Sequence, residues 1–239
     1  MQSSRLGPAI YLAILALAAP AVHAQTVDEI VAKNIEAKGG LETLKSTNSV
    51  RTTGTGTMQG NEVTITSFTK RPYFVRNEMS MAGQAIVMGS DGETAWMVAP
   101  GLPAKVQPPD KAEALKQSSQ IDSPLLDYKA RGTKIELGEP LTEGGRRFHH
   151  LIVRQKTGPV MHYYLDAATG LEAKMAIDVE EAGQQLKMEM RFSDFRTVEG
   201  RTVPYRMTQF VNGNQVSEIK FDKIEFNVPM EDSLFRIPK

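Results

Sequence analysis

The residues of this sequence best suited to metal or acid–base chemistry are three histidines on neighbouring predicted strands, His149, His150 and His162. Adjacent residues of a strand point to opposite faces of the sheet, so His149 and His150 do not easily share an ion. If Thr157-Gly158 forms a two-residue turn, His162 lies opposite Val153, roughly 10 Å along the strand from His150. The spacing therefore predicts no metal site, and we expect no cofactor.

Motifs that position a nucleophile or a nucleotide are absent from the sequence. It contains no Gly-x-Ser-x-Gly elbow, no Walker loop, no Gly-rich dinucleotide motif and no His-Glu-x-x-His. It also has no cysteine, which excludes disulfides, thiolate catalysis and thiolate metal sites. The carboxylates that can be placed lie on outward faces beside lysine or arginine, and nothing selects an acid/base pair. We therefore predict no catalytic residue and a protein that is not an enzyme.

A cationic corner beside an apolar strand is the most informative polar feature. In Lys70-Arg71-Pro72, the proline lacks a backbone N–H and pushes Arg71 into an extended conformation, which marks a turn or a sheet edge. The only tryptophan, Trp96, follows the hairpin signal Asp91-Gly92. The strand after Pro72 places four residues on one face, namely Tyr73, Val75, Met79 and Met81. This combination predicts a binding cavity with one arginine at its edge.

Apolar faces of other predicted strands extend that candidate cavity. Methionine is flexible and polarisable, and proteins use it where a surface must adapt to varied apolar ligands. An ordinary hydrophobic core is the alternative explanation for the same faces. The candidate cavity residues therefore include Trp96, the four residues Tyr73, Val75, Met79 and Met81, and seven more on other strands. These seven are Val63, Ile65, Met175, Ile177, Met188, Met190 and Phe192.

Hydrophobic periodicity predicts helix first and then many strands. Residues 26–45 have helical spacing, a capping box formed by Thr26 and Glu29, and a break at Gly39-Gly40. From residue 49 the period becomes two, which predicts an antiparallel meander. The predicted strands are 49–58, 62–70, 73–82, 85–90, 93–98, 133–137, 146–155, 160–165, 171–179, 184–195, 202–211 and 215–226.

Residues 99–132 interrupt the strand pattern. A proline-rich loop leads into two predicted short helices, one after the capping box Asp110/Glu113 and one at Pro124–Lys129. Long insertions of this kind are often functional lids, and we predict that this one is a lid.

The N-terminal 24 residues have the pattern of a cleaved signal peptide. Arg5 precedes an apolar run at Ala9–Ala19, and Val22-His23-Ala24 is a small-x-small cleavage site. The run is shorter than the about 20 residues that a membrane span needs, so an uncleaved anchor is the less favoured alternative. We expect cleavage after Ala24, no stable membrane insertion, and a soluble exported domain at 25–239. The balance of 28 basic and 28 acidic residues argues against a nucleic-acid partner.

Several short motifs, in order, resemble the periplasmic carriers of the outer-membrane lipoprotein-sorting (LolA-like) family. The matching segments are Glu36-Ala37-Lys38-Gly39-Gly40-Leu41, Lys70-Arg71-Pro72, Ser90-Asp91-Gly92-Glu93-Thr94-Ala95-Trp96, Ser123-Pro124-Leu125-Leu126-Asp127-Tyr128, Tyr163-Tyr164-Leu165-Asp166, Phe192-Ser193-Asp194-Phe195 and Phe226-Asn227-Val228-Pro229 to Ser233-Leu234-Phe235. No single motif is decisive, but their order covers nearly all of residues 26–238.

The resemblance implies a mainly β fold, an incomplete antiparallel β-barrel of about eleven strands with a helical lid over an apolar cavity. It also implies that Arg71 is a lid latch, because in the carriers this arginine bonds to lid backbone in the closed form. The implied function is a periplasmic carrier of lipoprotein or lipid acyl chains, loaded by an inner-membrane donor complex and unloaded to an outer-membrane acceptor. The alternatives are an envelope sensor or regulatory module that binds lipid or a protein partner, and an enzyme on the same fold.

Overall fold

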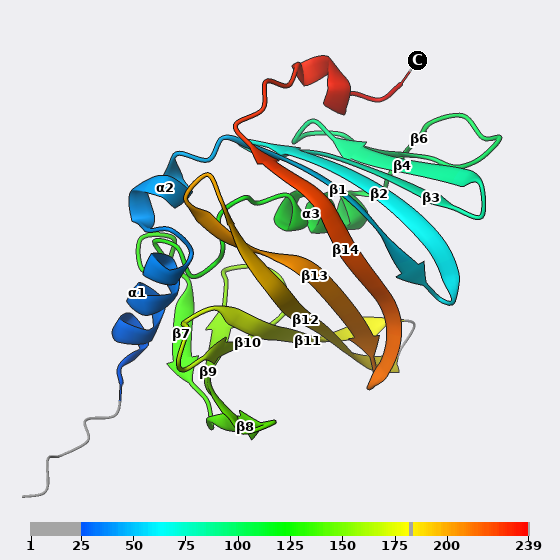
Figure 1. Ribbon diagram of the computed structural model, residues 1–239. Coiled ribbons are helices and arrows are strands. Elements are labelled where there is room, and N and C mark those ends of the chain that lie inside the picture. The colour runs from blue at the N-terminus through cyan, green and yellow to red at the C-terminus, as the bar shows by residue number, and fades with distance from the viewer. Residues whose placement is uncertain (1–24, 182–183, 239) are drawn as a thin grey trace, which may run out of the picture.

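The computed structural model describes residues 25–181 and 184–238, and one antiparallel sheet dominates them (Figure 1). Fourteen strands follow the order β6-β5-β4-β3-β2-β1-β14-β13-β12-β11-β10-β9-β7, with β8 paired to β9, and the sheet does not close. The predicted signal peptide at 1–24 lies outside the described residues. Within those residues, no helix is both long enough and apolar enough to cross a membrane.

The predicted meander is confirmed, with more strands than the expected eleven. Strands β6 and β8 were not predicted, because segments of two and three residues leave no periodic pattern. The strands are β1 Ser49–Met58, β2 Asn61–Lys70, β3 Phe74–Met81, β4 Gln84–Ser90, β5 Ala95–Val98, β6 Lys105–Val106, β7 Lys134–Leu137, β8 Leu141–Glu143, β9 Arg146–Arg154, β10 Met161–Asp166, β11 Glu172–Glu181, β12 Gln184–Val198, β13 Arg201–Val211 and β14 Asn214–Phe226.

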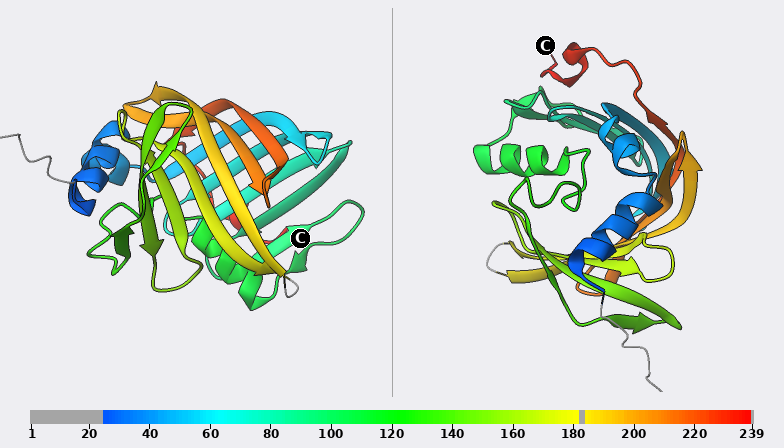
Figure 2. Two further views of the ribbon diagram at one scale, coloured as in Figure 1. Left: turned by 90° about the horizontal axis from the view of Figure 1, so that it is seen from below. Right: turned by 90° about the vertical axis from the view of Figure 1, so that its left-hand side faces the viewer.

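The sheet curls into an open arc that encloses the helices (Figure 2). Helices α1 (Val27–Ala37), α2 (Leu41–Lys45) and α3 (Pro109–Ser118) lie on its concave side. The C-terminal segment, with the 3₁₀ helix η1 (Asp232–Phe235), lies on the convex side. The three α-helices therefore all cover the concave face of the sheet.

Close approach of backbones makes the sharp curvature between β1 and β14 possible. A Cβ atom on Gly56 would lie 1.9 Å from the carbonyl oxygen of Glu218, and one on Gly54 would lie 2.6 Å from that of Lys220. A β-bulge sits beside this contact, where the register shifts between Thr53 and Gly54. Glycine at these positions lets the two strands approach closely, as glycine in strand interiors often does.

Helix α1 anchors one end of the arc. Its predicted capping box is present, since the Glu29 amide donates to Thr26 and the Thr26 amide donates to the Glu29 carboxylate. The apolar residues Ile30 and Val31 are buried against β9 and β10. The core cluster built in this way contains Ile30, Val31, Leu125, Leu151, Val153, Tyr163 and Leu165.

The turn between α1 and α2 packs tightly on the β12–β13 turn. Gly39 has a φ of 117°, and a Cβ atom there would lie 2.1 Å from the carbonyl oxygen of Gly200. The amide of Thr202 donates to the carbonyl of Lys38 over 3.1 Å. Only glycine fits this position, so the predicted break at Gly39-Gly40 also fixes where α2 sits on the sheet.

The insertion at 99–132 contains one helix where two were predicted. Helix α3 begins at Pro109 and is preceded by Pro108, so the predicted capping box at Asp110/Glu113 is wrong. Residues 124–129 form turns, because Asp127 has a φ of 49° and breaks the helical pattern. Helix α3 contacts β3, β4 and β5, and Gln117 donates to Thr157 between β9 and β10 over 3.3 Å. The insertion therefore links two distant parts of the arc.

Candidate functional site

A pocket of about 290 Å³ lies between the sheet and the segments on its concave side. Its walls come from α1, α2, the loop at 121–126 and the inward faces of β1, β13 and β14. The lining is mostly apolar, with a few polar and charged groups, and consists of Asn34, Ile35, Lys38, Leu44, Thr47, Val50, Thr52, Ile121, Asp122, Ser123, Leu125, Leu126, Arg201, Thr202, Val203, Pro204, Phe221, Ile224 and Phe226. Such a pocket suits an apolar ligand that carries a small polar part.

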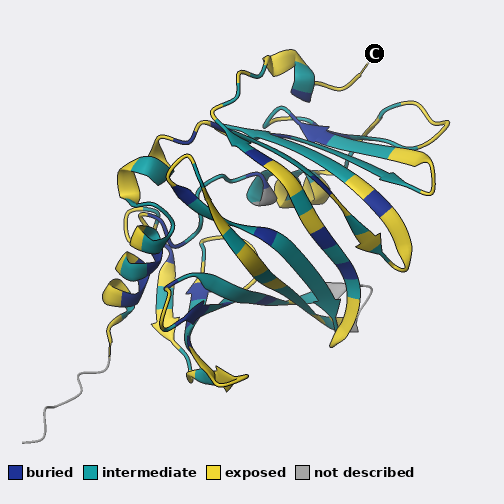
Figure 3. Cartoon of the chain, in the orientation of Figure 1, coloured by how far each residue is buried: buried dark blue, intermediate teal, exposed yellow. Residues whose placement is uncertain are grey.

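The loop that covers the pocket is packed into the domain. Buried positions are scattered over α1 and many of the strands, whereas the hairpin tips are exposed (Figure 3). Leu125 and Leu126, in the loop that covers the pocket, are buried beneath it. The loop is therefore held to the domain by apolar packing as well as by polar contacts.

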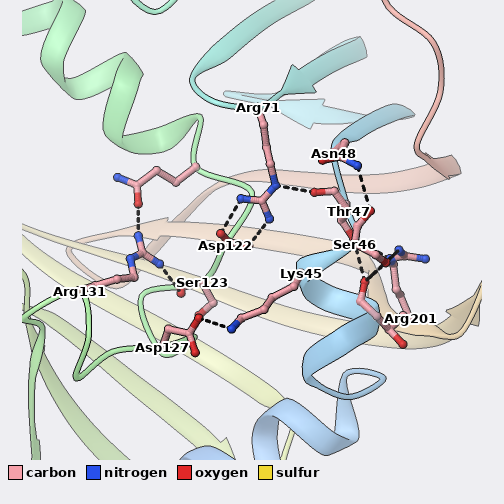
Figure 4. Close-up of polar contacts among 12 residues, drawn as sticks. Lys45, Ser46, Thr47, Asn48, Arg71, Asp122, Ser123, Asp127, Arg131 and Arg201 are labelled. Carbon is pink, nitrogen blue, oxygen red and sulfur yellow. Dashed lines mark hydrogen bonds and ion pairs between the residues drawn. The ribbon is translucent and has the colours of Figure 1, made fainter.

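Arg71 connects three segments at the edge of the pocket (Figure 4). Its Nη1 and Nη2 donate to the two carboxylate oxygens of Asp122 over 2.7 and 2.6 Å. Its Nε donates to the carbonyl of Thr47 over 2.7 Å. The hydrogen bond with Asp122 raises the pKa of Arg71. Arg71, at the β2–β3 turn, is thus bound in a bidentate manner to the insertion and singly to the α2–β1 connection.

Two further ion pairs hold the same loop to the helices. Lys45 of α2 lies 2.7 Å from the carboxylate of Asp127, and Lys129 lies 2.6 Å from that of Asp28 in α1. The hydrogen bond from Lys129 lowers the pKa of Asp28, and Tyr128 contributes a second hydrogen bond. Both pairs are exposed, so each adds little to stability on its own.

Arg201, at the start of β13, occupies the wall of the pocket and is only 6% exposed. Its Nε donates to the Thr47 hydroxyl over 2.7 Å, and its Nη2 donates to the Thr43 carbonyl over 2.9 Å. The guanidinium also lies 4.8 Å from the ring centroid of Phe226. Thr47 therefore accepts hydrogen bonds from two arginines, Arg71 at its carbonyl and Arg201 at its hydroxyl.

Four predicted cavity residues lie on the concave face, away from the pocket. Cross-strand partners point to the same side of a sheet, and Gly54 pairs with Ile65, Gly56 with Val63. Ile65 in turn pairs with Met79, and Val63 with Met81. Val63 is buried, and Ile65, Met79 and Met81 are half-buried. None of the four lines the pocket.

The five predicted residues of β11 and β12 belong to the same concave face. Met175 pairs with Met190 and Ile177 with Met188, while Phe192 pairs with Met207 of β13. Met207 pairs with Ile219 of β14, which pairs with Gly56. Val75 pairs with Thr69, and Thr69 pairs with the pocket residue Val50 on its other side. Val75 is therefore also on the concave face, and it is buried. The face therefore carries methionines on both arms of the arc, but none of these residues lines the pocket.

Trp96 lies on the convex face, which corrects its expected place in the cavity. It pairs with Gly89, and Gly89 pairs with Arg76, whose neighbours on β3 point to the concave side. Its indole N–H donates to the carbonyl of Phe235 over 2.7 Å, and the side chain is 0% exposed. The C-terminal segment covers it, and sequence spacing alone does not place that segment. Tyr73 precedes β3 and is exposed beside Lys116 of α3.

The histidines are closer together than the sequence predicted. His162 pairs with Ile152, not Val153, because the β9–β10 connection shifts the register by one residue. The Nε2 of His150 lies 2.8 Å from the Nδ1 of His162, and the two rings stack. Burial lowers the pKa of His150, and the charge of His162 lowers it further. Among the described residues, no three His, Asp or Glu side chains are grouped to hold a metal ion.

Sequence reasoning missed the residues that line the pocket. Phe226 and Ile224 share a face with Phe221 and Ile219 only because the bulge beside Gly54 shifts the alternation of β14. Strict period-two counting would instead put Phe226 and Ile224 on one face and Phe221 and Ile219 on the other. The aromatic and β-branched composition near the end of β14 was the one available signal.

The fold can be compared with solved structures, although no protein-family model and no curated protein matches the sequence. A putative outer membrane lipoprotein-sorting protein domain from Vibrio parahaemolyticus superposes with a TM-score of 0.55 at 12% identity, covering 88% of this chain and 97% of that one. A LolA superfamily protein from Nitrosomonas europaea gives a TM-score of 0.54 at 12% identity, covering 89% and 98%. A DUF1329 family protein from Desulfovibrio piger gives 0.59 at 10% identity, covering 88% and 97%.

The chain therefore has a LolA-like fold, an unclosed antiparallel sheet that wraps around short helices. The resemblance that the sequence motifs indicated is confirmed at the level of the fold.

Proposed function

We propose that the protein is a periplasmic carrier that binds an acyl chain of a lipoprotein or lipid beneath its helices and transports it towards the outer membrane. The observation that carries this proposal is the largely apolar pocket between the sheet and the helices. A carrier must shield a chain from water, and burial of each CH₂ is worth about 0.8 kcal/mol. The likeness of the fold to lipoprotein-sorting proteins supports the same function.

The proposed ligand path continues from the pocket onto the methionine-rich part of the concave face. The half-buried Met79 and Met81 on one arm and Met188 and Met190 on the other offer adaptable apolar contacts beyond the pocket. A chain longer than the pocket would extend over them once the insertion moves. In this proposal the insertion at 99–132 is the lid, and Arg71 is its latch.

Transfer in such a carrier needs partners that supply direction. A bilayer gives an acyl chain nearly the same environment as an apolar pocket, so loading from a membrane gains little free energy. We propose an energised inner-membrane donor and an outer-membrane acceptor that binds the chain more tightly. Export by the 1–24 signal peptide with cleavage after Ala24 belongs to the same proposal.

Two matched variants test the pocket. Thr52 lines the pocket, while its neighbour Thr53 points to the opposite face, and both are half-buried. Filling the pocket with Thr52→Trp is expected to weaken saturable binding of a fluorescent acyl-chain probe at least about tenfold, equal to about 1.4 kcal/mol. Thr53→Trp is expected to leave it unchanged. Delipidated wild-type protein that shows no saturable probe binding would exclude the carrier function.

A further inference from the structure

One wall of the pocket carries a positive charge that no carboxylate balances. Arg201 donates to Thr47, Thr43, Ser46 and the carbonyl of Glu199, which are all neutral acceptors. The Glu199 carbonyl is 2.9 Å from Nη1, and the Ser46 hydroxyl is 3.1 Å from Nη2. No ion pair in the described part of the chain includes Arg201.

The two neighbouring cations are each balanced. Lys38, which also lines the pocket, lies 2.9 Å from the carboxylate of Glu172, and Arg71 is paired with Asp122. The group around Thr47 thus has three cations and two carboxylates, with a net charge of about one positive. A guanidinium is a fixed positive charge in proteins. Buried charges are normally paired, and this one is not.

The rest of the pocket is suited to a hydrocarbon chain. Val203, Phe221, Ile224 and Phe226 extend from Arg201 along β13 and β14. The volume of about 290 Å³ is at the lower limit of the roughly 300–1,000 Å³ usual for small-molecule sites. The pocket therefore combines one cationic end with space for a single chain.

We propose that the pocket takes a single-chain anionic amphiphile whose carboxylate or phosphate binds beside Arg201 and Lys38, with its chain on Val203, Phe221 and Ile224. This inference rests on the proposed carrier function and specifies its ligand. The anion supplies the missing negative charge beside a guanidinium that is only 6% exposed, and charge-assisted hydrogen bonds are stronger than neutral ones. Free fatty acids and single-chain phospholipids share this chemistry.

A competition series on the wild-type protein tests the head group. A neutral fluorescent naphthylamine is bound first, and then dodecanoate, dodecyl phosphate, dodecanol and dodecyltrimethylammonium are titrated in below their micelle concentrations. At least one of the two anions is expected to compete about tenfold better than dodecanol, equal to about 1.4 kcal/mol, and the cation worst. Whichever of the two anions competes better identifies the preferred head group, a fatty-acid carboxylate or a lipid phosphate.

Three variants separate charge from structure. Arg201→Gln and Arg201→Lys both lose hydrogen bonds to α2, but only Arg201→Lys keeps the charge and should keep the preference for anions. The pair Lys223→Gln with Glu225→Gln, which lies outside the pocket lining, removes one charge of each sign and should also keep the preference. If the Arg201 variants do not fold, the wild-type series alone decides.

Two results have different consequences. Equal competition by all four amphiphiles, or a retained anion preference in folded Arg201→Gln, would overturn the anionic ligand and leave the carrier function standing. No binding of the naphthylamine or of any amphiphile would instead exclude the carrier function itself.

Discussion

Arg71 binds Asp122 and Thr47 at once, so a single side chain couples the insertion, the β2–β3 turn and the α2–β1 connection. The side chains of Arg71 and Asp122 are 32% and 26% exposed, so solvent screens their attraction only in part. This arrangement resembles the latch implied by the sequence, with one difference. The resemblance implied a bond from this arginine to lid backbone, whereas here Arg71 donates to the carboxylate of Asp122 in the insertion.

A double-mutant cycle measures the coupling free energy between Arg71 and Asp122 in the proposed latch. Arg71→Leu and Asp122→Asn, singly and together, are expected to show a coupling of about 1 kcal/mol in urea unfolding, because the pair is bidentate and partly buried. Each single variant should also release an acyl probe faster in stopped-flow exchange. Lys129→Gln, which breaks an exposed pair with Asp28, is the control and should leave stability close to that of the wild type. Release at the wild-type rate in Arg71→Leu would rule out the latch.

The stacked histidine pair on β9 and β10 predicts a pH dependence. Burial lowers the folded-state pKa of His150 below its unfolded value of about 6.5, and His162 adds to the effect. At acidic pH the unfolded chain then binds more protons than the folded protein. The contribution of His150 to the free energy of unfolding is therefore fully present above pH 6.5 and is lost as the pH falls below that value. Urea midpoints at pH 7.5 and 5.5 should show this fall, and His150→Gln should reduce it. An NMR titration that places the pKa of His150 at or above 6.5 would contradict the prediction.

At the scale of the element, strand β1 is shaped by its glycines. The bend between β1 and β14 brings the Glu218 carbonyl to 1.9 Å from where a Gly56 Cβ would lie. A side chain there must push the two strands apart, and the pocket floor on β1 and β14 would move with them. Curvature of this sheet therefore depends on residue size at single positions.

Gly56→Ala is expected to destabilise the protein by about 1–3 kcal/mol, as overpacking of a tight contact does. The adjacent Thr55 is exposed, and Thr55→Ala should stay within about 0.5 kcal/mol of the wild type. Urea denaturation of both variants measures their free energies of unfolding for this comparison. Equal stability of the two variants would show that the strands can separate at no cost.

At the scale of the whole molecule, the C-terminal segment covers one part of the convex side of the sheet. Phe235 is fully buried, packs 5.3 Å from the ring centroid of Phe74, and accepts the indole N–H of Trp96 at its carbonyl. Arg76 also donates to the carbonyl of Leu234 over 3.2 Å. The segment thus covers a surface formed by strands more than 130 residues earlier in the chain.

Phe235→Ala is expected to cost about 3 kcal/mol, within the range for a fully buried phenylalanine, and to loosen the segment. Trp96 is the only tryptophan, so its fluorescence should shift to the red as its indole becomes exposed to water. Ile237→Ala, at an exposed position of the same segment, is the control and should leave the spectrum unchanged. An unshifted spectrum in folded Phe235→Ala would contradict the covering role.

Local patterns in the sequence determined the elements of this protein. Period-two alternation predicted twelve of the strands within a few residues, and the Thr26/Glu29 capping box predicted the start of α1. These features depend on neighbours in the chain, and their physical causes act over a few residues. The same alternation grouped Met79 with Met81 and Met188 with Met190, and the strand register then placed both pairs on the concave face.

Only the tertiary structure decided which apolar face holds the pocket and which charges meet beside it. The bulge at Gly54 reassigns β14, the pairing with Gly89 puts Trp96 on the convex face under the C-terminal segment, and Thr47 joins Arg71 to Arg201 across 130 residues. Each depends on contacts between segments far apart in the chain, where strand register and close backbone approach set the geometry. Residue types and their spacing carry no record of those contacts.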